Sequence, residues 1–102
     1  MSTATLTYHR RARWTLEQLS EEEQKEIREA VNSLVDLPLD RWPSDRVKLI
    51  DPERSRYMLL ATSYWRVFFN RSATGEIDVD NIMNKEAIRV LGGHGPGAGS
   101  KG

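Results

Sequence analysis

The sequence has no cysteine, no net charge and no long apolar run, and each absence argues against particular classes of protein. Without cysteine the chain can form no disulfide and offers no thiol, which fits a reducing cytoplasm. No run of about 18 apolar residues is present, so no transmembrane helix is expected. The first residues, MSTATLTYHRR, lack the basic-then-apolar order of a secretory signal peptide. We therefore expect a cytoplasmic protein without a membrane partner.

Histidine is also scarce, because only His9 and His94 occur and they lie far apart. With no cysteine beside them, this spacing matches no metal site, and we expect neither a metal nor a cofactor. His9 is interpreted as a surface residue or as an acid–base group. The glycine-rich segment GGHGPGAGSKG, residues 92–102, predicts a flexible tail. Residues 1–91 suit a single domain.

Charge is balanced in total but divided along the chain. Residues 21–40 contain seven acidic and two basic residues, whereas residues 41–71 contain seven basic and three acidic ones. The first segment predicts an acidic helix that begins at Ser20, because Ser20 and Glu23 have the spacing of a capping box. The second segment is a basic sheet region, which is compatible with phosphate binding.

The hydrophobic pattern predicts an α+β fold in the order β-α-α-β-β-β with a short C-terminal helix. A β-rich run covers residues 3–8, and a short helix follows from about Arg11. Between Tyr57 and Lys85, apolar and polar residues alternate through two or three runs separated by turns, which predicts a β-meander. We expect the helices to cover one face of a mainly antiparallel sheet. Trp14 and Trp42 are both interpreted as core residues.

Arg66 is the most informative residue, because the surrounding strand YWRVFF is otherwise apolar and aromatic. Burying an unpaired charge costs several kcal/mol, so this cation requires a partner or a function. Strand alternation places Trp65, Val67 and Phe69 on one face and Arg66 with Phe68 on the other. Two interpretations have equal weight. Arg66 forms an ion pair with Asp78 or Asp80, or it contacts phosphate.

The neighbours of Arg66 on the preceding strand are either Met58 and Leu60 or Tyr57 and Leu59, because the sequence alone does not determine the register in which the two strands pair. Both alternatives give an apolar face with one embedded guanidinium, and Met58, Leu60 and Phe68 form a candidate groove for a partner helix or strand. Lys48, Arg54 and Arg56 form either a phosphate-facing rim or a solvated strand edge. Tyr64 is a candidate proton donor or base-stacking ring, and is equally consistent with packing.

The element order and the pattern YMLLATSYWRVFFN…NIMNKEAI resemble the RelE/ParE superfamily of toxins from bacterial type II toxin–antitoxin modules. The resemblance covers about residues 3–91. Its main elements are the WRVFF strand, the VKLID strand before it, and Asn84-Lys85 at the end of the sheet. It implies growth arrest, either by metal-independent cleavage of mRNA on the ribosome or by inhibition of DNA gyrase. It also implies a cognate antitoxin partner.

The resemblance assigns roles to particular residues. Arg66 matches the arginine that stabilises the transition state in ribonuclease members, and Lys85 lies where a second basic residue is usual. Lys48 and Arg56 complete the expected catalytic set, while Arg54, Tyr64, Met58, Leu60 and Phe68 are expected to bind RNA or the partner protein.

Three departures keep other functions open. Met58 and Leu60 occupy positions that are lysines in RelE, Leu91 stands near an expected tyrosine, and the chain is neutral. The alternatives are therefore a ParE-like gyrase inhibitor without enzymatic activity, or a degenerate toxin that acts only by binding.

Overall fold

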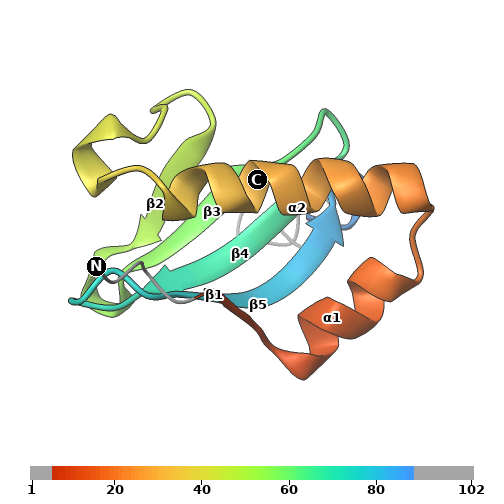
Figure 1. Ribbon diagram of the computed structural model, residues 1–102, viewed down its shortest axis with the longest axis horizontal. Coiled ribbons are helices and arrows are strands. Elements are labelled where there is room, and N and C mark those ends of the chain that lie inside the picture. The colour runs from red at the N-terminus through yellow and green to blue at the C-terminus, as the bar shows by residue number, and fades with distance from the viewer. Residues whose placement is uncertain (1–5, 89–102) are drawn as a thin grey trace, which may run out of the picture.

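The computed structural model describes residues 6–88 and shows five strands in one sheet, with two helices over one face (Figure 1). The helices are α1 (Arg10–Glu17) and α2 (Glu21–Val35). The strands are β1 (Leu6–Tyr8), β2 (Val47–Asp51), β3 (Arg56–Leu60), β4 (Trp65–Arg71) and β5 (Ile77–Asn84). Short 3-10 turns, Leu39–Arg41 and Pro52–Arg54, flank β2, and residues 85–88 are helical.

This architecture confirms the predicted α+β fold and its mainly antiparallel sheet. The meander contains three strands, β3 to β5, which is the larger of the two expected numbers. Residues 3–5 of the first predicted strand, the tail 92–102 and His94 lie outside the described residues. Within residues 6–88, no helix combines the length and the apolar character needed to cross a lipid bilayer.

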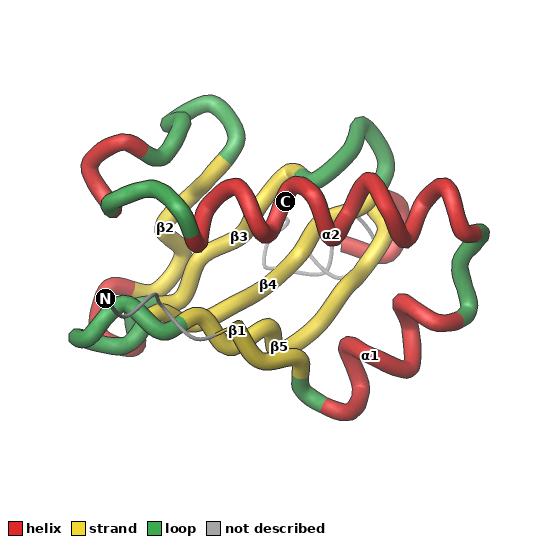
Figure 2. Tube along the Cα trace, in the orientation of Figure 1, coloured by secondary structure: helices red, strands yellow, loops and turns green. Residues whose placement is uncertain are grey.

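The strand order is β1-β5-β4-β3-β2, so the first and last strands of the described chain are neighbours. Each of the strands β2 to β5 pairs antiparallel with the next one along the chain, while β1 runs parallel to β5, with Leu6 opposite Ile77 and Tyr8 opposite Val79. Figure 2 shows β1 beside β5. A bulge in β5 shifts the register between Phe68 and Phe69. This bulge decides which residues of β5 reach each end of β4.

Local sequence signals explain both helix starts. His9 caps α1, where its imidazole Nδ1 accepts the Arg11 amide at 3.5 Å. Ser20 and Glu23 form the predicted capping box, with Glu21, Glu22 and Glu23 at the positive end of the helix dipole. Helix α2 ends at Val35, three residues before Pro38, which cannot continue a helix.

The core lies between the helices and the sheet. It is built from apolar residues of α1, α2, β3, β4, β5 and the turn after β3: Ala12, Leu16, Ile27, Val31, Leu34, Leu59, Ala61, Val67, Phe69, Ile77, Val79 and Ile82. Three of these residues come from β5, which explains why that strand is central to the packing. The predicted inward face of β4 is confirmed, because Val67 and Phe69 are fully buried and Trp65 packs against the cluster.

The two tryptophan predictions have different outcomes. Trp42 closes the core, as predicted: its ring meets Tyr57 and Phe69 edge-on, and its indole N–H donates to the carbonyl oxygens of Leu34 and Leu37. The core prediction for Trp14 is wrong, since this side chain is 64% exposed. In α1 the buried stripe runs through Ala12 and Leu16. Trp14 lies two positions from each of them and therefore points to the opposite side of the helix.

Candidate functional site

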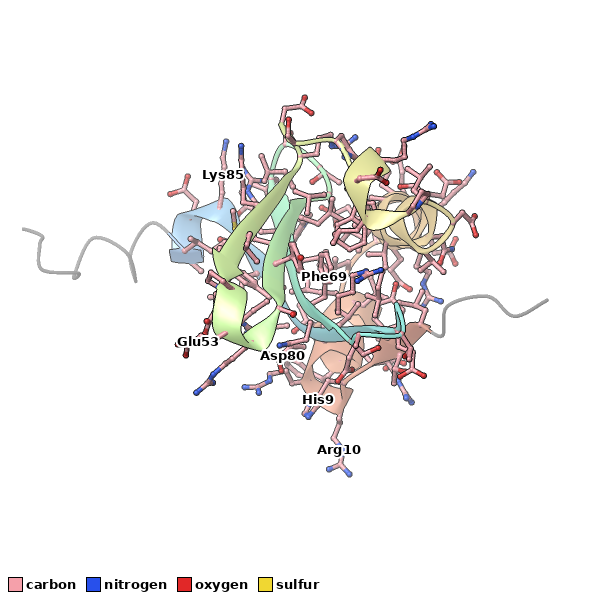
Figure 3. All side chains as sticks on the ribbon, turned by 90° about the vertical axis from the view of Figure 1, so that its left-hand side faces the viewer. His9, Arg10, Glu53, Phe69, Asp80 and Lys85 are labelled. Carbon is pink, nitrogen blue, oxygen red and sulfur yellow. The ribbon has the colours of Figure 1, made fainter. Side chains whose placement is uncertain are left out.

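The sheet face opposite the two helices, called the open face below, carries most of the candidate residues. Leu60 lies opposite Arg66, Met58 opposite Phe68, and Arg56 opposite Asn70. The register therefore follows the first of the two predicted alternatives, with Met58 and Leu60 beside Arg66. Strand β5 adds Met83 opposite Arg66 and Asn81 opposite Phe68. Figure 3 shows the sheet between α2 on one side and the helical segment that begins at Lys85 on the other.

Arg66 is half-buried at the end of β4 and is folded back on the turn that precedes the strand. Its Nη1 donates to the carbonyl oxygens of Thr62, at 2.9 Å, and Trp65, at 3.3 Å. These carbonyls fix the direction of the guanidinium, yet they neutralise none of its charge. Among the described residues, Arg66 has no carboxylate partner, and its other nitrogens donate no hydrogen bond. The group thus keeps a full charge and several donors beside apolar side chains.

The predicted ion pair between Arg66 and Asp78 or Asp80 is wrong. Arg66 lies opposite Met83, whereas Asp78 lies opposite Asn70, four residues away along β4. Four residues of strand span roughly 13 Å, which is too far for an ion pair. Asp80 lies in the bulge near the same far end and pairs with Arg56 instead. Sequence analysis could not locate the bulge, so it placed these carboxylates too close to Arg66.

Arg56 has the partners that Arg66 lacks. Its Nη2 lies 2.8 Å from Asp80 Oδ2, its Nη1 donates to Asn70 Oδ1 at 3.2 Å, and its guanidinium carbon lies 5.5 Å from the centre of the Phe68 ring. The second oxygen of Asp80 accepts from Arg11 of α1 at 3.5 Å. Arg56 and Asp80 are each 27% exposed. Arg56 is therefore neutralised and held in place, which suits positioning better than charge stabilisation.

The remaining predicted residues lie around these two arginines. Lys85 is exposed, and its amide donates to the Tyr64 carbonyl at 2.8 Å, which places it at the Arg66 end of the sheet. Tyr64 is 41% exposed and meets Trp65 edge-on. Lys48 lies opposite Met58, and its Nζ donates to the Ser44 carbonyl. Arg54 forms an exposed pair with Asp51 at 3.7 Å.

The four predicted catalytic residues do not converge on one point. Arg66 and Lys85 belong to one end of the open face, and Arg56 lies at the other end, with Met58 and Phe68 between them. Four residues of strand, roughly 13 Å, separate the two arginines along the sheet, and the guanidinium of Arg56 is already bound to Asp80 and Asn70. An extended chain with several phosphates can contact both. His9 caps α1 and Asp80 links Arg56 to Arg11, so neither lies next to Arg66.

Strand alternation places Asn70 on the same face as Arg66, but sequence reasoning did not identify the contacts around Arg56. The bond from Arg56 to Asn70 and the link through Asp80 to Arg11 depend on the pairing of β5 with β4 and on the position of α1. The sequence carries no local signal for either arrangement.

Comparison with known proteins gives structural matches only: no protein-family profile matches the sequence, and no curated protein matches it. One similar structure is the archaeal RelE–RelB complex from Pyrococcus horikoshii, with a TM-score of 0.68 and 16% identity over 82% of this chain and 97% of that one. The chain has the RelE fold. A second is the toxin–antitoxin complex RelBE2 from Mycobacterium tuberculosis, with a TM-score of 0.56 and 15% identity, covering 82% of this chain and all of that one. The RelE fold thus extends over most of this chain without close sequence similarity.

Proposed function

We propose that this chain is the toxin of a toxin–antitoxin module and arrests growth by cleaving mRNA, with Arg66 stabilising the transition state. The observation that carries the proposal is a guanidinium on the open face of a RelE fold that no carboxylate within residues 6–88 neutralises. The two structures compared above are a RelE–RelB complex and a toxin–antitoxin complex, RelBE2. The neutral net charge implies that affinity for the target comes from this face rather than from the whole surface.

The chemistry matches the position of Arg66. Attack of a ribose 2′-hydroxyl on the adjacent phosphorus forms a 2′,3′-cyclic phosphate, while the bond from phosphorus to the 5′-oxygen of the next nucleotide breaks. The 2′-hydroxyl gives up its proton to solvent, and the leaving 5′-oxygen takes one up. The transition state carries negative charge on the non-bridging oxygens. A guanidinium can donate to two such oxygens at once, and its apolar neighbours Leu60 and Met83 strengthen the interaction by limiting water. Because Nη1 is held by the Thr62 carbonyl, the free nitrogens have a defined direction before substrate binds.

The other basic residues serve the RNA chain. Lys85, near the same end of the sheet, adds positive charge close to the reacting phosphate, and we propose it as the assisting residue. Arg56, neutralised by Asp80, and Lys48, at the edge strand, position more distant nucleotides. Tyr64 is exposed beside Arg66 and offers a ring for base stacking.

The antitoxin is proposed to cover the same face. Met58, Leu60, Phe68 and Met83 form an apolar surface on the side of the sheet that α1 and α2 do not cover. Such a surface binds an amphipathic helix or an added strand through apolar anchors. A partner that covers Arg66 with this surface would block the proposed active site directly.

The decisive experiment is induced expression in bacteria followed by pulse-labelling of protein, RNA and DNA. Wild-type protein is expected to stop protein synthesis first, while Arg66→Ala lowers cleavage by about 10²–10³-fold, as for loss of one transition-state donor. Arg66→Lys keeps the charge without the planar group and is expected to remain strongly impaired. Arg10→Ala, which removes an exposed arginine from α1, is the matched control. Arrest of DNA synthesis first, or full activity of soluble Arg66→Ala protein, would refute the proposal.

The partner surface has its own test. Co-expression with the product of an adjacent small reading frame is expected to restore growth and yield a stable complex. Phe68→Asp should weaken that complex, because it places a charge within the apolar surface. Leu49→Asp is the control, since Leu49 is 52% exposed but pairs with Tyr57 and so lies on the opposite side of the sheet. Equal effects of the two substitutions would contradict the placement.

A further inference from the structure

The turn between β3 and β4, residues 61–64, supplies the groups that hold Arg66 in place. The Arg66 Nη1 donates to two carbonyl oxygens, those of Thr62 and Trp65. Thr62 lies within this turn, and Trp65 is the residue at which the turn ends and β4 begins. The direction of the guanidinium therefore depends on the conformation of a short segment whose own side chains carry no charge.

The Thr62 side chain fixes the conformation of this turn. Its hydroxyl oxygen accepts from the backbone amides of Tyr64, at 3.1 Å, and Trp65, at 2.9 Å. Serine and threonine hydroxyls that bond to amides two or three residues further along the chain hold the backbone in a turn. One hydroxyl thus holds the two residues that lead into β4, while the carbonyl of the same threonine accepts from Arg66.

The turn is also attached to two other parts of the fold. The Tyr64 carbonyl accepts from the Lys85 amide at 2.8 Å, which joins the turn to the end of β5. The Trp65 indole N–H donates to the Glu23 carboxylate at 3.0 Å, which joins it to the first turn of α2. The Thr62 hydroxyl sets the backbone between these two attachments. The same turn therefore holds both residues proposed above to act at the reacting phosphate, Arg66 and Lys85.

We propose that Thr62 is a positioning residue for Arg66: its hydroxyl sets the turn, and the carbonyls of the turn set the direction of the guanidinium before substrate binds. The inference rests on the proposed role of Arg66 in RNA cleavage. A guanidinium stabilises the transition state only when its donors meet the non-bridging oxygens, and a displacement of about 1 Å can cost about 10²-fold in rate. Thr62 thus acts on the reaction through Arg66 and needs no contact with the RNA.

The activity test uses Thr62→Val in the full chain, because valine keeps the branched shape of threonine and lacks the hydroxyl. In single-turnover cleavage of a reporter mRNA in a cell-free translation reaction, the rate at saturating protein should fall about 10- to 100-fold, with the half-saturating concentration unchanged. Thr62→Ser keeps the hydroxyl and should restore the wild-type rate. The matched control is Ser72→Ala in the β4–β5 turn, where the lost hydroxyl accepts from the Glu76 amide at 3.0 Å, and this variant should cleave normally.

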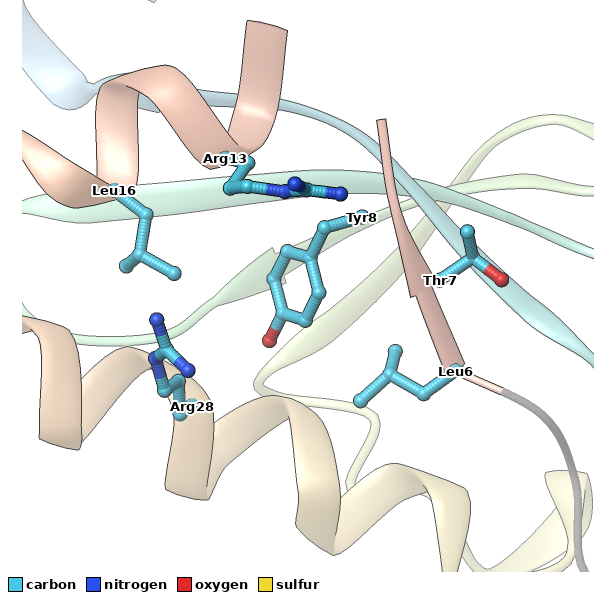
Figure 4. Close-up of a pocket in the computed structure, with 6 residues that line it drawn as sticks. All are labelled: Leu6, Thr7, Tyr8, Arg13, Leu16 and Arg28. Atoms are coloured by element: carbon cyan, nitrogen blue, oxygen red, sulfur yellow. The ribbon is translucent and has the colours of Figure 1, made fainter. Parts of the chain in front are cut away.

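An NMR measurement on the free protein tests the positioning without RNA. The order parameter of the Arg66 Nε–H, assigned by its absence in Arg66→Lys, should be about 0.85 in the wild type and below about 0.6 in Thr62→Val. Arg13 is the internal reference for a mobile guanidinium. It is an exposed residue of α1 that lines a pocket between β1, α1 and α2, on the helical side of the sheet (Figure 4). Its order parameter should be low in every variant.

The two measurements separate this inference from the proposed function. A lowered Arg66 order parameter in Thr62→Val, in a chain that cleaves no RNA, would support the positioning role while the proposed cleavage fails. An unchanged Arg66 order parameter in Thr62→Val would overturn the inference whatever the activity. Equal rate losses in Thr62→Val and Ser72→Ala would also overturn it, as would a Thr62→Ser variant that is as slow as Thr62→Val.

Discussion

Asp80→Asn is expected to destabilise the protein by about 1.5 kcal/mol, because it removes the anion that holds Arg56 on the open face. Fully exposed ion pairs contribute only about 0.2–1 kcal/mol, whereas hydrogen bonds to charged groups contribute about 1.5–3 kcal/mol. The Arg56–Asp80 pair lies between these limits, since its N–O distance is 2.8 Å and both side chains are 27% exposed. For a domain of this size the change corresponds to a fall in Tm of roughly 6–12 °C.

A double-mutant cycle measures this interaction directly. Urea denaturation of the wild-type chain, Asp80→Asn, Arg56→Gln and the double variant gives the coupling energy, which we expect at about 1–2 kcal/mol. The internal reference is the Arg54–Asp51 pair, whose 3.7 Å distance and 79% and 38% exposures predict less than about 0.5 kcal/mol. If Asp80→Asn is as destabilising in the absence of Arg56 as in its presence, the assignment of Asp80 as the partner of Arg56 is refuted.

Three further predictions concern the fold. The Trp65 indole N–H and the Ser20 amide donate to the Glu23 carboxylate and lower its pKa. The stability that this contact contributes is therefore fully present above the ordinary pKa of glutamate, about 4.3, and is lost as the pH falls through the lowered pKa. In the Glu23→Gln variant, the free energy of unfolding should therefore lack this pH-dependent contribution, as acid unfolding will show. Ser20→Ala should cost about 1 kcal/mol in urea denaturation, with Ser33→Ala inside α2 as the control that leaves the cap intact. Phe69→Ala, at a fully buried ring, should cost about 3–5 kcal/mol and abolish the near-ultraviolet circular dichroism of the native state.

Local signals in the sequence were sufficient for much of the fold. The capping box at Ser20 depends on residues three apart, and the inward face of β4 depends on simple alternation, so both could be predicted. The choice between Met58 with Leu60 and Tyr57 with Leu59 depends on how residues 61–64 turn between the strands. Short-range patterns do not determine that turn, and the alternative remained open until the register was observed.

The site was less accessible to sequence reasoning, because its electrostatics depend on distant residues. Arg66 was correctly placed on the apolar outer face, but its carboxylate partner was not correctly predicted. The bulge in β5 moves Asp80 next to Arg56, and α1 brings Arg11 to the same carboxylate. The exposure of Trp14 shows a related limit, since an aromatic residue on the side of a short helix opposite its buried stripe still resembles a core residue in composition.

The parallel pairing of β1 with β5 has a consequence for how the protein is made. β5 separates β1 from the rest of the sheet and contributes Ile77, Val79 and Ile82 to the core. Of the five described strands, β1 is synthesised first and has no partner in the sheet until β5, the fifth, has been added. At translation rates of about 5–20 residues per second, the N-terminal strand waits several seconds for its neighbour. We expect the nascent chain to acquire its native sheet only after residues 77–84 have left the ribosome, so that the Arg66 face forms after β5 has been synthesised rather than as soon as β4 is available.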